Sequence, residues 1–175
     1  MDRAVSMPPI ANSAVGGRDG VIGDGVQFAR DGKFIAGTIG SGQLSRIDAM
    51  GGTASALDYS IKGFVNVLGH PSLRMRVDGR VMMACQRCLE PVELVVAVNS
   101  DLEMREALDE IEGADDDVDR VLAGKSMDVA TLVEDEVLLE LPMVARHDAC
   151  ESINDDPSGT KRASPFAALA NRPRR

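Results

Sequence analysis

Two short pairs of metal-ligating side chains stand about sixty residues apart in this chain. Cys85 and Cys88 form a Cys-x-x-Cys pair, and His147 and Cys150 repeat the same two-residue gap further along. Three thiolates and one imidazole supply the four ligands of a tetrahedral zinc site, and a site that uses all four has no open position for a catalytic water. The pattern therefore predicts structural zinc, provided that the fold brings the two pairs together.

Two other interpretations of these residues stay open. In the first, Cys85 and Cys88 are ordinary thiols at strand ends and His147 lies on the surface. In the second, the Cys-x-x-Cys is a redox pair, although redox pairs of the thioredoxin type open a helix in a βαβ unit, and antiparallel strands are expected here. The chain has three cysteines, an odd number, which argues against a disulfide framework and fits a reducing compartment.

Other catalytic motifs are incomplete or absent in this sequence. Gly124-Lys125-Ser126 is like the end of a phosphate-binding loop, but Asp119 occupies the position of the required first glycine. The chain has no Gly-x-Ser-x-Gly elbow, and only His70 and His147 are available as imidazole acid–base groups. We therefore expect a protein that is not an enzyme and has no small-molecule substrate.

The Cys-x-x-Cys lies between runs of alternating apolar residues that predict β-strands. Asp78-Gly79 is typical of a tight hairpin turn, and Gly69-His70-Pro71 predicts another turn. Before them, Phe28, Phe34 and Ile35 suggest a short strand or docking segment, and residues 41–50 have a weak helical spacing. The predicted strand runs are residues 60–67, 73–77, 81–85 and 92–98.

A helix is predicted from Asp128, which can cap it, to about Leu141, just before Pro142. Its apolar residues recur at three- and four-residue spacings, whereas Glu134, Asp135 and Glu140 are expected to face water. The apolar positions are Val129, Leu132, Val133, Val137 and Leu141. The expected fold is thus α+β: an antiparallel, barrel-like β-meander covered by one main helix.

Length and charge suggest one domain with tails. With 175 residues we expect a flexible lead-in over 1–25, a single domain over 26–156 and a basic tail over 157–175. Within the domain, residues of about 107–126 are acidic and predict a solvated loop. Without an apolar h-region at the start or a run of eighteen apolar residues, we expect a cytoplasmic protein with no membrane partner.

The basic tail is the best candidate for contact with phosphate, because the net charge of the whole chain is −9. A short turn after Ser164-Pro165 carries two apolar side chains, and cations follow it. The other interpretation of this segment is a frayed, solubilising tail. Arg74, Arg76 and Arg80, with Arg87 between the two cysteines, form a smaller basic group. The residues predicted to bind RNA or a partner are Arg87, Phe166, Leu169, Arg172, Arg174 and Arg175.

Three stretches, in this order, resemble the YceD family of large ribosomal RNA subunit accumulation proteins. They are the run from Val81 to Pro91 around the Cys-x-x-Cys, the helix from Leu132 to Pro142 followed by His147 and Cys150, and the end at 164–169. Some members of this family have a further Cys-x-x-Cys after the helix, where this chain has only His147 and Cys150.

The resemblance implies a β-rich domain with helical additions and no known catalytic activity. It also implies a part in the synthesis, processing or stability of 23S rRNA in bacteria. The expected partners are a pre-ribosomal particle or a ribosome-assembly protein, and 23S rRNA through the basic tail. A zinc-stabilised interaction module with another partner and a thiol redox protein are the alternatives.

Overall fold

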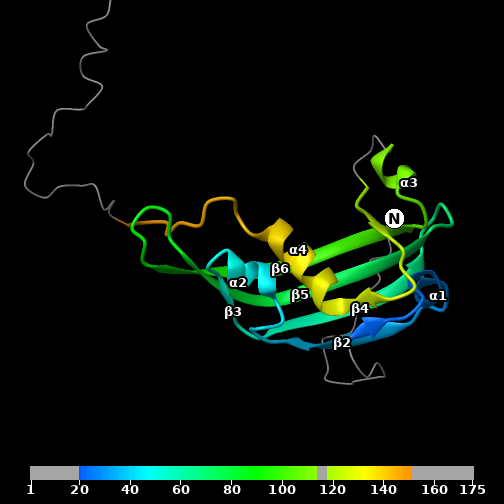
Figure 1. The fold of residues 1–175 in the computed structure, drawn as a ribbon, viewed down its shortest axis with the longest axis horizontal. Coiled ribbons are helices and arrows are strands. Elements are labelled where there is room, and N and C mark those ends of the chain that lie inside the picture. Colours follow the sequence, from blue (N-terminus) through cyan, green and yellow to red (C-terminus); the bar gives the residue numbers. More distant parts are fainter. Residues whose placement is uncertain (1–19, 114–117, 151–175) are drawn as a thin grey trace, which may run out of the picture.

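The computed structural model describes residues 20–113 and 118–150, and within them the chain forms a mixed α+β fold dominated by one sheet (Figure 1). This agrees with the α+β class expected from the sequence. In chain order the elements are β1 (Val21–Ile22), α1 (Gly25–Arg30), β2 (Phe34–Ile39), α2 (Ser45–Ala49), β3 (Thr53–Ala54), β4 (Leu57–Val65), β5 (Pro71–Ala84), β6 (Pro91–Arg105), α3 (Asp109–Glu112), β7 (Arg120–Leu122), β8 (Met127–Asp128) and α4 (Val129–Glu140).

The main sheet has six strands in the order β2-β4-β5-β6-β7, with β3 beside β5. The pairs from β2 to β6 are antiparallel, as the meander prediction requires, but β7 is parallel to β6. Among the described residues the sheet stays open, so the expected barrel-like closure was wrong. The reason is that β2 and β7 are the two edges of the sheet and do not pair with each other.

The hairpin of β5 and β6 is the longest feature of the sheet. The two strands pair over nearly their full length, from Ser72 opposite Glu103 to Ala84 opposite Pro91. Alternate side chains point to opposite faces, and the inward set on β5 is fully buried at Leu73, Met75 and Val77. This inner face is aliphatic and Met-rich, and it forms the floor of the core.

The hairpin turn predicted at Asp78-Gly79 is absent, because both residues lie within β5. Gly79 has an ordinary strand conformation there, and a Cβ at this position would lie 2.4 Å from Leu57 Cδ2. The glycine therefore permits close approach of Leu57, at the point where β4 begins and β3 ends. At the same point Ser55 N–H and Oγ–H both donate to Arg80 O, at 2.9 Å each.

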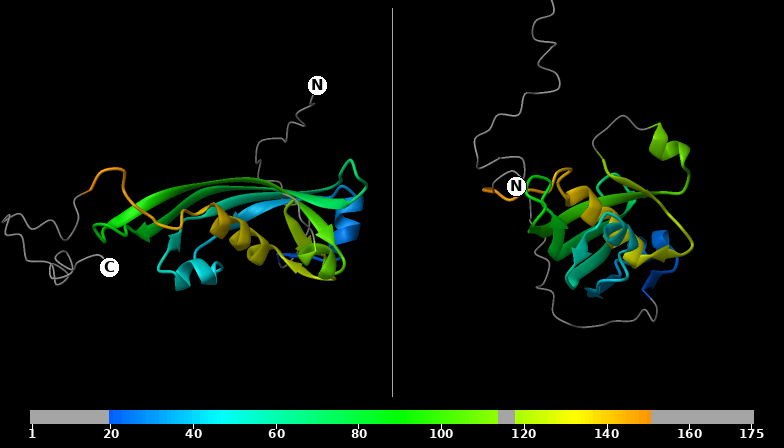
Figure 2. Two further views of the ribbon diagram at one scale, coloured as in Figure 1. Left: turned by 90° about the horizontal axis from the view of Figure 1, so that it is seen from above. Right: turned by 60° about the vertical axis from the view of Figure 1, so that its left-hand side comes forward.

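Helix α4 lies on the inner face of the sheet together with α2, and Figure 2 shows both helices on the same side of the sheet. Asp128 caps α4 by accepting from Thr131 N–H at 2.8 Å. Four of the five predicted apolar positions, Val129, Leu132, Val133 and Val137, are buried. Leu141 is partly buried against the same core. The helix prediction is thus confirmed in its cap, its extent and its buried face.

Glu134 does not face water as predicted, because α2 covers it. Its side chain is 5% exposed and accepts from the backbone N–H groups of Arg46 at 2.7 Å and Ile47 at 3.1 Å. Burial alone would raise the pKa of Glu134, but these bonds and the Arg46 guanidinium at 2.9 Å hold that pKa below its usual value. One carboxylate therefore satisfies two of the free N–H groups at the start of a five-residue helix.

Part of the expected lead-in of residues 1–25 belongs to the fold. Strand β1 pairs with β8, and Ile22 is buried in the core. The expected lead-in was thus wrong for residues 20–25, and its remainder, 1–19, lies outside the described residues. Further on, Phe28 lies in α1, Phe34 and Ile35 lie in β2, and the weak helical spacing of residues 41–50 becomes α2.

The acidic stretch of 107–126 is only partly the solvated loop that its composition predicts. Helix α3 is exposed, with no buried residue, in keeping with its charge. Strand β7, however, adds to the sheet edge: Val121 pairs with Met104 and packs against the core. The exception follows from Val121 and Ala123, two apolar residues among the acidic ones.

Replacing Glu134 with alanine should lower the free energy of unfolding by about 3 kcal/mol, since it leaves two backbone donors and the Arg46 guanidinium without their buried acceptor. The matched control is Glu140→Ala on the exposed face of the same helix, which should change stability by roughly 0.5 kcal/mol or less. Urea unfolding followed by circular dichroism measures both. Equal effects of the two substitutions would contradict this role of Glu134.

Candidate metal centre

The Cys-x-x-Cys lies in the turn that joins β5 to β6, as the flanking alternation predicts. Two backbone bonds close the turn: Cys85 N–H donates to Glu90 O, and Leu89 N–H donates to Cys85 O, both at 2.9 Å. Leu89 has φ +62°, a left-handed conformation that a residue with a Cβ adopts at a cost of about 1–2 kcal/mol. The turn is therefore held in a shape that its local sequence alone would not favour.

After α4 the chain returns to this turn, which the sequence could not establish. Gln86 N–H donates to Ala145 O at 2.8 Å, tying the two segments together through their backbones. Ala145 is buried with Cys85 and Val92 in a small apolar cluster of its own. The segment that carries His147 and Cys150 is thereby placed against the hairpin tip.

The four predicted ligands meet at one point. Their ligand atoms all lie within 4.8 Å of one another. The Sγ atoms of Cys85 and Cys150 are 3.8 Å apart, and Cys88 Sγ lies 3.4 Å from His147 Nδ1. Metal bonds of 2.3 Å to sulfur and 2.0–2.1 Å to nitrogen give tetrahedral edges of about 3.8 Å between sulfurs and about 3.5 Å between sulfur and nitrogen. Both measured contacts have the length of such edges.

The imidazole of His147 has one nitrogen committed and one available. Nε2–H donates to Pro91 O at 3.0 Å. Nδ1 therefore carries the lone pair in the neutral ring, and it is the nitrogen that faces Cys88. A second hydrogen bond of this kind orients the ring of most metal-ligating histidines. The first strand residue of β6 thus fixes the tautomer that a metal requires.

The thiols form an electrostatically coupled group. Burial raises the pKa of Cys85, but backbone N–H groups of Cys88, Arg87 and His147 outweigh it and lower the pKa to about 5. Burial also raises the pKa of Cys150, and its contacts with Cys85 and Cys88 raise it further, to about 11. The Cys85 thiolate is therefore favoured, and repulsion opposes the ionisation of Cys150. A divalent cation would stabilise all three thiolates together.

Of the remaining predicted binding residues, one lies beside this centre and the others lie outside the described residues. Arg87 is exposed in the turn, one residue before Cys88. Phe166, Leu169, Arg172, Arg174 and Arg175 lie outside the described residues, so the tail prediction stays a prediction. Sequence reasoning missed the supporting carbonyl groups of Pro91 and Ala145, for which no local sequence signal exists because any residue supplies a carbonyl.

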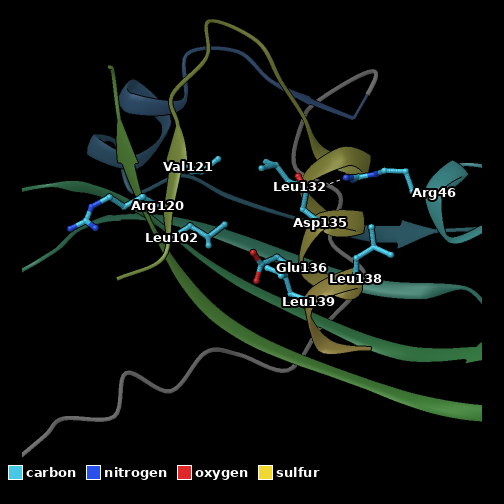
Figure 3. A pocket seen from close by; sticks show the side chains of 9 residues that line it. All are labelled: Arg46, Leu102, Arg120, Val121, Leu132, Asp135, Glu136, Leu138 and Leu139. Carbon is cyan, nitrogen blue, oxygen red and sulfur yellow. Dashed lines mark hydrogen bonds and ion pairs between the residues drawn. The ribbon is translucent and has the colours of Figure 1, made fainter. Parts of the chain in front are cut away.

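A depression of about 430 Å³ lies between α4 and the β6–β7 edge of the sheet (Figure 3). Leu102, Val121 and Leu132 line it, and Glu136 is its buried acid. Burial, together with the nearby charges of Asp119 and Asp135, keeps the pKa of Glu136 above its usual value. The other charged residues that line this depression are Asp135, Arg46 and Arg120.

The family comparison covers the hairpin, α4 and all four ligand-type residues. The model of the family described as "Large ribosomal RNA subunit accumulation protein YceD" matches residues 73–171, more than half of the 175 residues. No curated protein and no solved structure gives a significant match. In the described part of the chain, no helix is long and apolar enough to cross a membrane. The chain belongs to the YceD family of large ribosomal RNA subunit accumulation proteins.

Proposed function

We propose that this protein is a non-enzymatic accessory factor for the synthesis, processing or stability of 23S rRNA in bacteria, and that it works in the cytoplasm. The observation that carries the proposal is the family match over residues 73–171. That match includes the hairpin tip and the segment after α4. Both segments that meet at the cysteines therefore belong to the region that the family shares. The role is one of binding within ribosome assembly.

We also propose that Cys85, Cys88, His147 and Cys150 hold a structural zinc ion. The donor set fits zinc, since thiolates and imidazole are its preferred ligands and Nδ1 of His147 is free to bind. Four protein ligands leave no position for substrate or water, which supports a structural role and no catalytic one. The ion would join the hairpin tip to the chain beyond α4, two segments that otherwise meet through a small apolar cluster and two hydrogen bonds.

Thiol redox chemistry is the second candidate, favoured by the low pKa of Cys85 at about 5. Against it stand the complete burial of Cys85 and the position of the pair between two antiparallel strands, away from any helix N-terminus. Zinc content separates the two candidates, because bound zinc occupies the thiolates that redox exchange requires.

A protein of the pre-ribosomal particle is a suitable partner for the surface beside the metal centre. Leu89 is 63% exposed, Met143 fully exposed and Val144 half exposed. Leu89 adjoins the ligand Cys88, and Val144 adjoins Ala145, which bonds to the turn. Exposed apolar side chains on the two segments that form the centre are suited to a protein contact. The basic tail of 157–175 is proposed to touch rRNA in the same complex.

The purified protein should contain close to one zinc per chain, and Cys85→Ser and His147→Ala should each lose most of it because each removes one of four ligands. The matched control is Gln86→Ala, in the same turn with an exposed side chain outside the ligand set. Inductively coupled plasma mass spectrometry gives the metal content. Wild-type protein prepared under reducing conditions but free of zinc would sink the metal proposal and favour the redox candidate.

A bacterial strain lacking this gene should accumulate less 23S rRNA than its parent, with 16S rRNA changed far less. Northern blots and sucrose-gradient profiles of ribosomal subunits measure the effect. Complementation with wild-type protein should restore the level, and Cys85→Ser should restore it only in part because the binding domain loses its metal. Unchanged rRNA and subunit profiles in the deletion strain would overturn the ribosomal role.

A further inference from the structure

The outer face of the sheet carries no described helix. Helices α2 and α4 lie on the inner face (Figure 2), and α1 meets the inner side of β4, where its backbone would contact a Cβ at Gly63. On the outer face β4, β5 and β6 present polar and aromatic side chains in rows set by the strand register. In the described part of the chain this face is open to a partner.

Two adjacent rows make this face basic at one end. In the first row Phe34, Lys62, Arg74 and Asp101 stand side by side across four strands. In the second row Ser60 and Arg76 are neighbours, about 7 Å further along the strands. These rows hold three cations against one acid, in a protein whose net charge is −9. Asp58 and Asp78, which pair with each other in the third row, mark the boundary of this basic strip.

The cations of the strip are only partly occupied. Arg74 makes a bidentate pair with Asp101, with both bonds at 2.6 Å. Arg76 makes one long bond to Asn99 Oδ1, at 3.3 Å, and Lys62 has no ion-pair partner among the described residues. Between them Ser60 is 1% exposed, and its Oγ lacks a hydrogen-bond partner. An anionic ligand would therefore find two available cations, Lys62 and Arg76, whereas the buried Ser60 hydroxyl lies beneath the surface that it would contact.

Aromatic rings accompany these cations. The chain has four phenylalanines and no tryptophan, and Phe34 and Phe64 both lie on this outer face, Phe34 with 36% exposure. The Arg74 guanidinium lies 5.0 Å from the centroid of the Phe64 ring. Sheet surfaces that bind single-stranded RNA use cations to contact the phosphates. They also use aromatic rings and guanidinium planes to stack on the bases.

We infer that this basic strip binds single-stranded RNA directly, with Lys62 and Arg76 on the phosphates and Phe34 with the Arg74–Phe64 pair against the bases. The inference rests on the proposed rRNA role and assigns the RNA contact to the sheet, in addition to the predicted tail. It uses residues distant from the metal centre, so the two sites can be tested separately.

The test uses the full chain and a short fluorescein-labelled single-stranded RNA of mixed sequence in fluorescence anisotropy. Lys62→Gln/Arg76→Gln should weaken binding about ten-fold, and it should lower the slope of log affinity against log salt by about 1.4, since two phosphate contacts are lost. Phe34→Leu, which keeps the apolar contact but removes the ring, should weaken binding about five-fold or more without changing the salt slope.

The charge-matched control is Arg30→Gln/Lys125→Gln, two exposed cations outside the strip, and it should stay within about two-fold of wild type. Equal loss in both double variants, or loss only when Arg172, Arg174 and Arg175 are replaced, would overturn the inference. Loss of binding to a ribosomal protein with RNA affinity unchanged would overturn it in favour of a protein partner.

Failure of the strip is distinguishable from failure of the ribosomal role. If Lys62→Gln/Arg76→Gln fully restores 23S rRNA in the deletion strain, the role stands and the strip is not its RNA contact. If the deletion itself leaves rRNA unchanged, the role fails whatever the strip binds in solution.

Discussion

The alternation of side chains along the β5–β6 hairpin is the constraint on which the rest of this structure depends. Because successive residues point to opposite faces, the same two strands supply the aliphatic floor of the core and the polar outer face. The core contains few aromatic rings, and α4 packs the aliphatic side chains of Val129, Val133 and Val137 against the sheet. The hairpin also fixes where its tip lies, and hence where Cys85 and Cys88 stand.

The two ends of the hairpin have different chemistry. At the tip, the turn and the segment after α4 meet through the Gln86–Ala145 and His147–Pro91 bonds, which bring the four ligand atoms together. At the opposite end, Glu103 is buried and accepts from Asn66 and His70 near the β4–β5 turn. The proposed RNA strip lies on the outer face between these ends. A metal at the tip would therefore stabilise the scaffold without occupying the proposed RNA strip.

Much of the fold could be predicted from the sequence because its signals are local. The Asp128 cap, the spacing of Val129 to Val137 and the alternation from Val92 to Val98 each depend on neighbours within a few residues. The failures came from distant contacts. Asp78-Gly79 has the sequence of a hairpin turn, but the glycine is present because Leu57 approaches it closely. Glu134 has the sequence position of a surface acid, but α2 places two N–H donors against it.

The candidate site was predictable in its members and unpredictable in its assembly. The two-residue gaps identified the four candidates Cys85, Cys88, His147 and Cys150. No local pattern could show that two pairs about sixty positions apart would converge. The outer-face group was visible only in part, as alternate arginines at 74 and 76. Lys62 and Phe34 join them through strand pairing, which a single strand's sequence does not contain.

The central claim is that one metal ion joins the hairpin tip to the chain beyond α4 through all four of these residues. X-ray absorption spectroscopy at the zinc edge of the purified protein tests it most directly, because it counts sulfur and nitrogen ligands. The account predicts three sulfurs at about 2.3 Å and one nitrogen at about 2.0 Å in a four-coordinate shell. A shell with only two sulfurs, completed by oxygen, would mean that the two segments are not joined by the metal and would contradict the account.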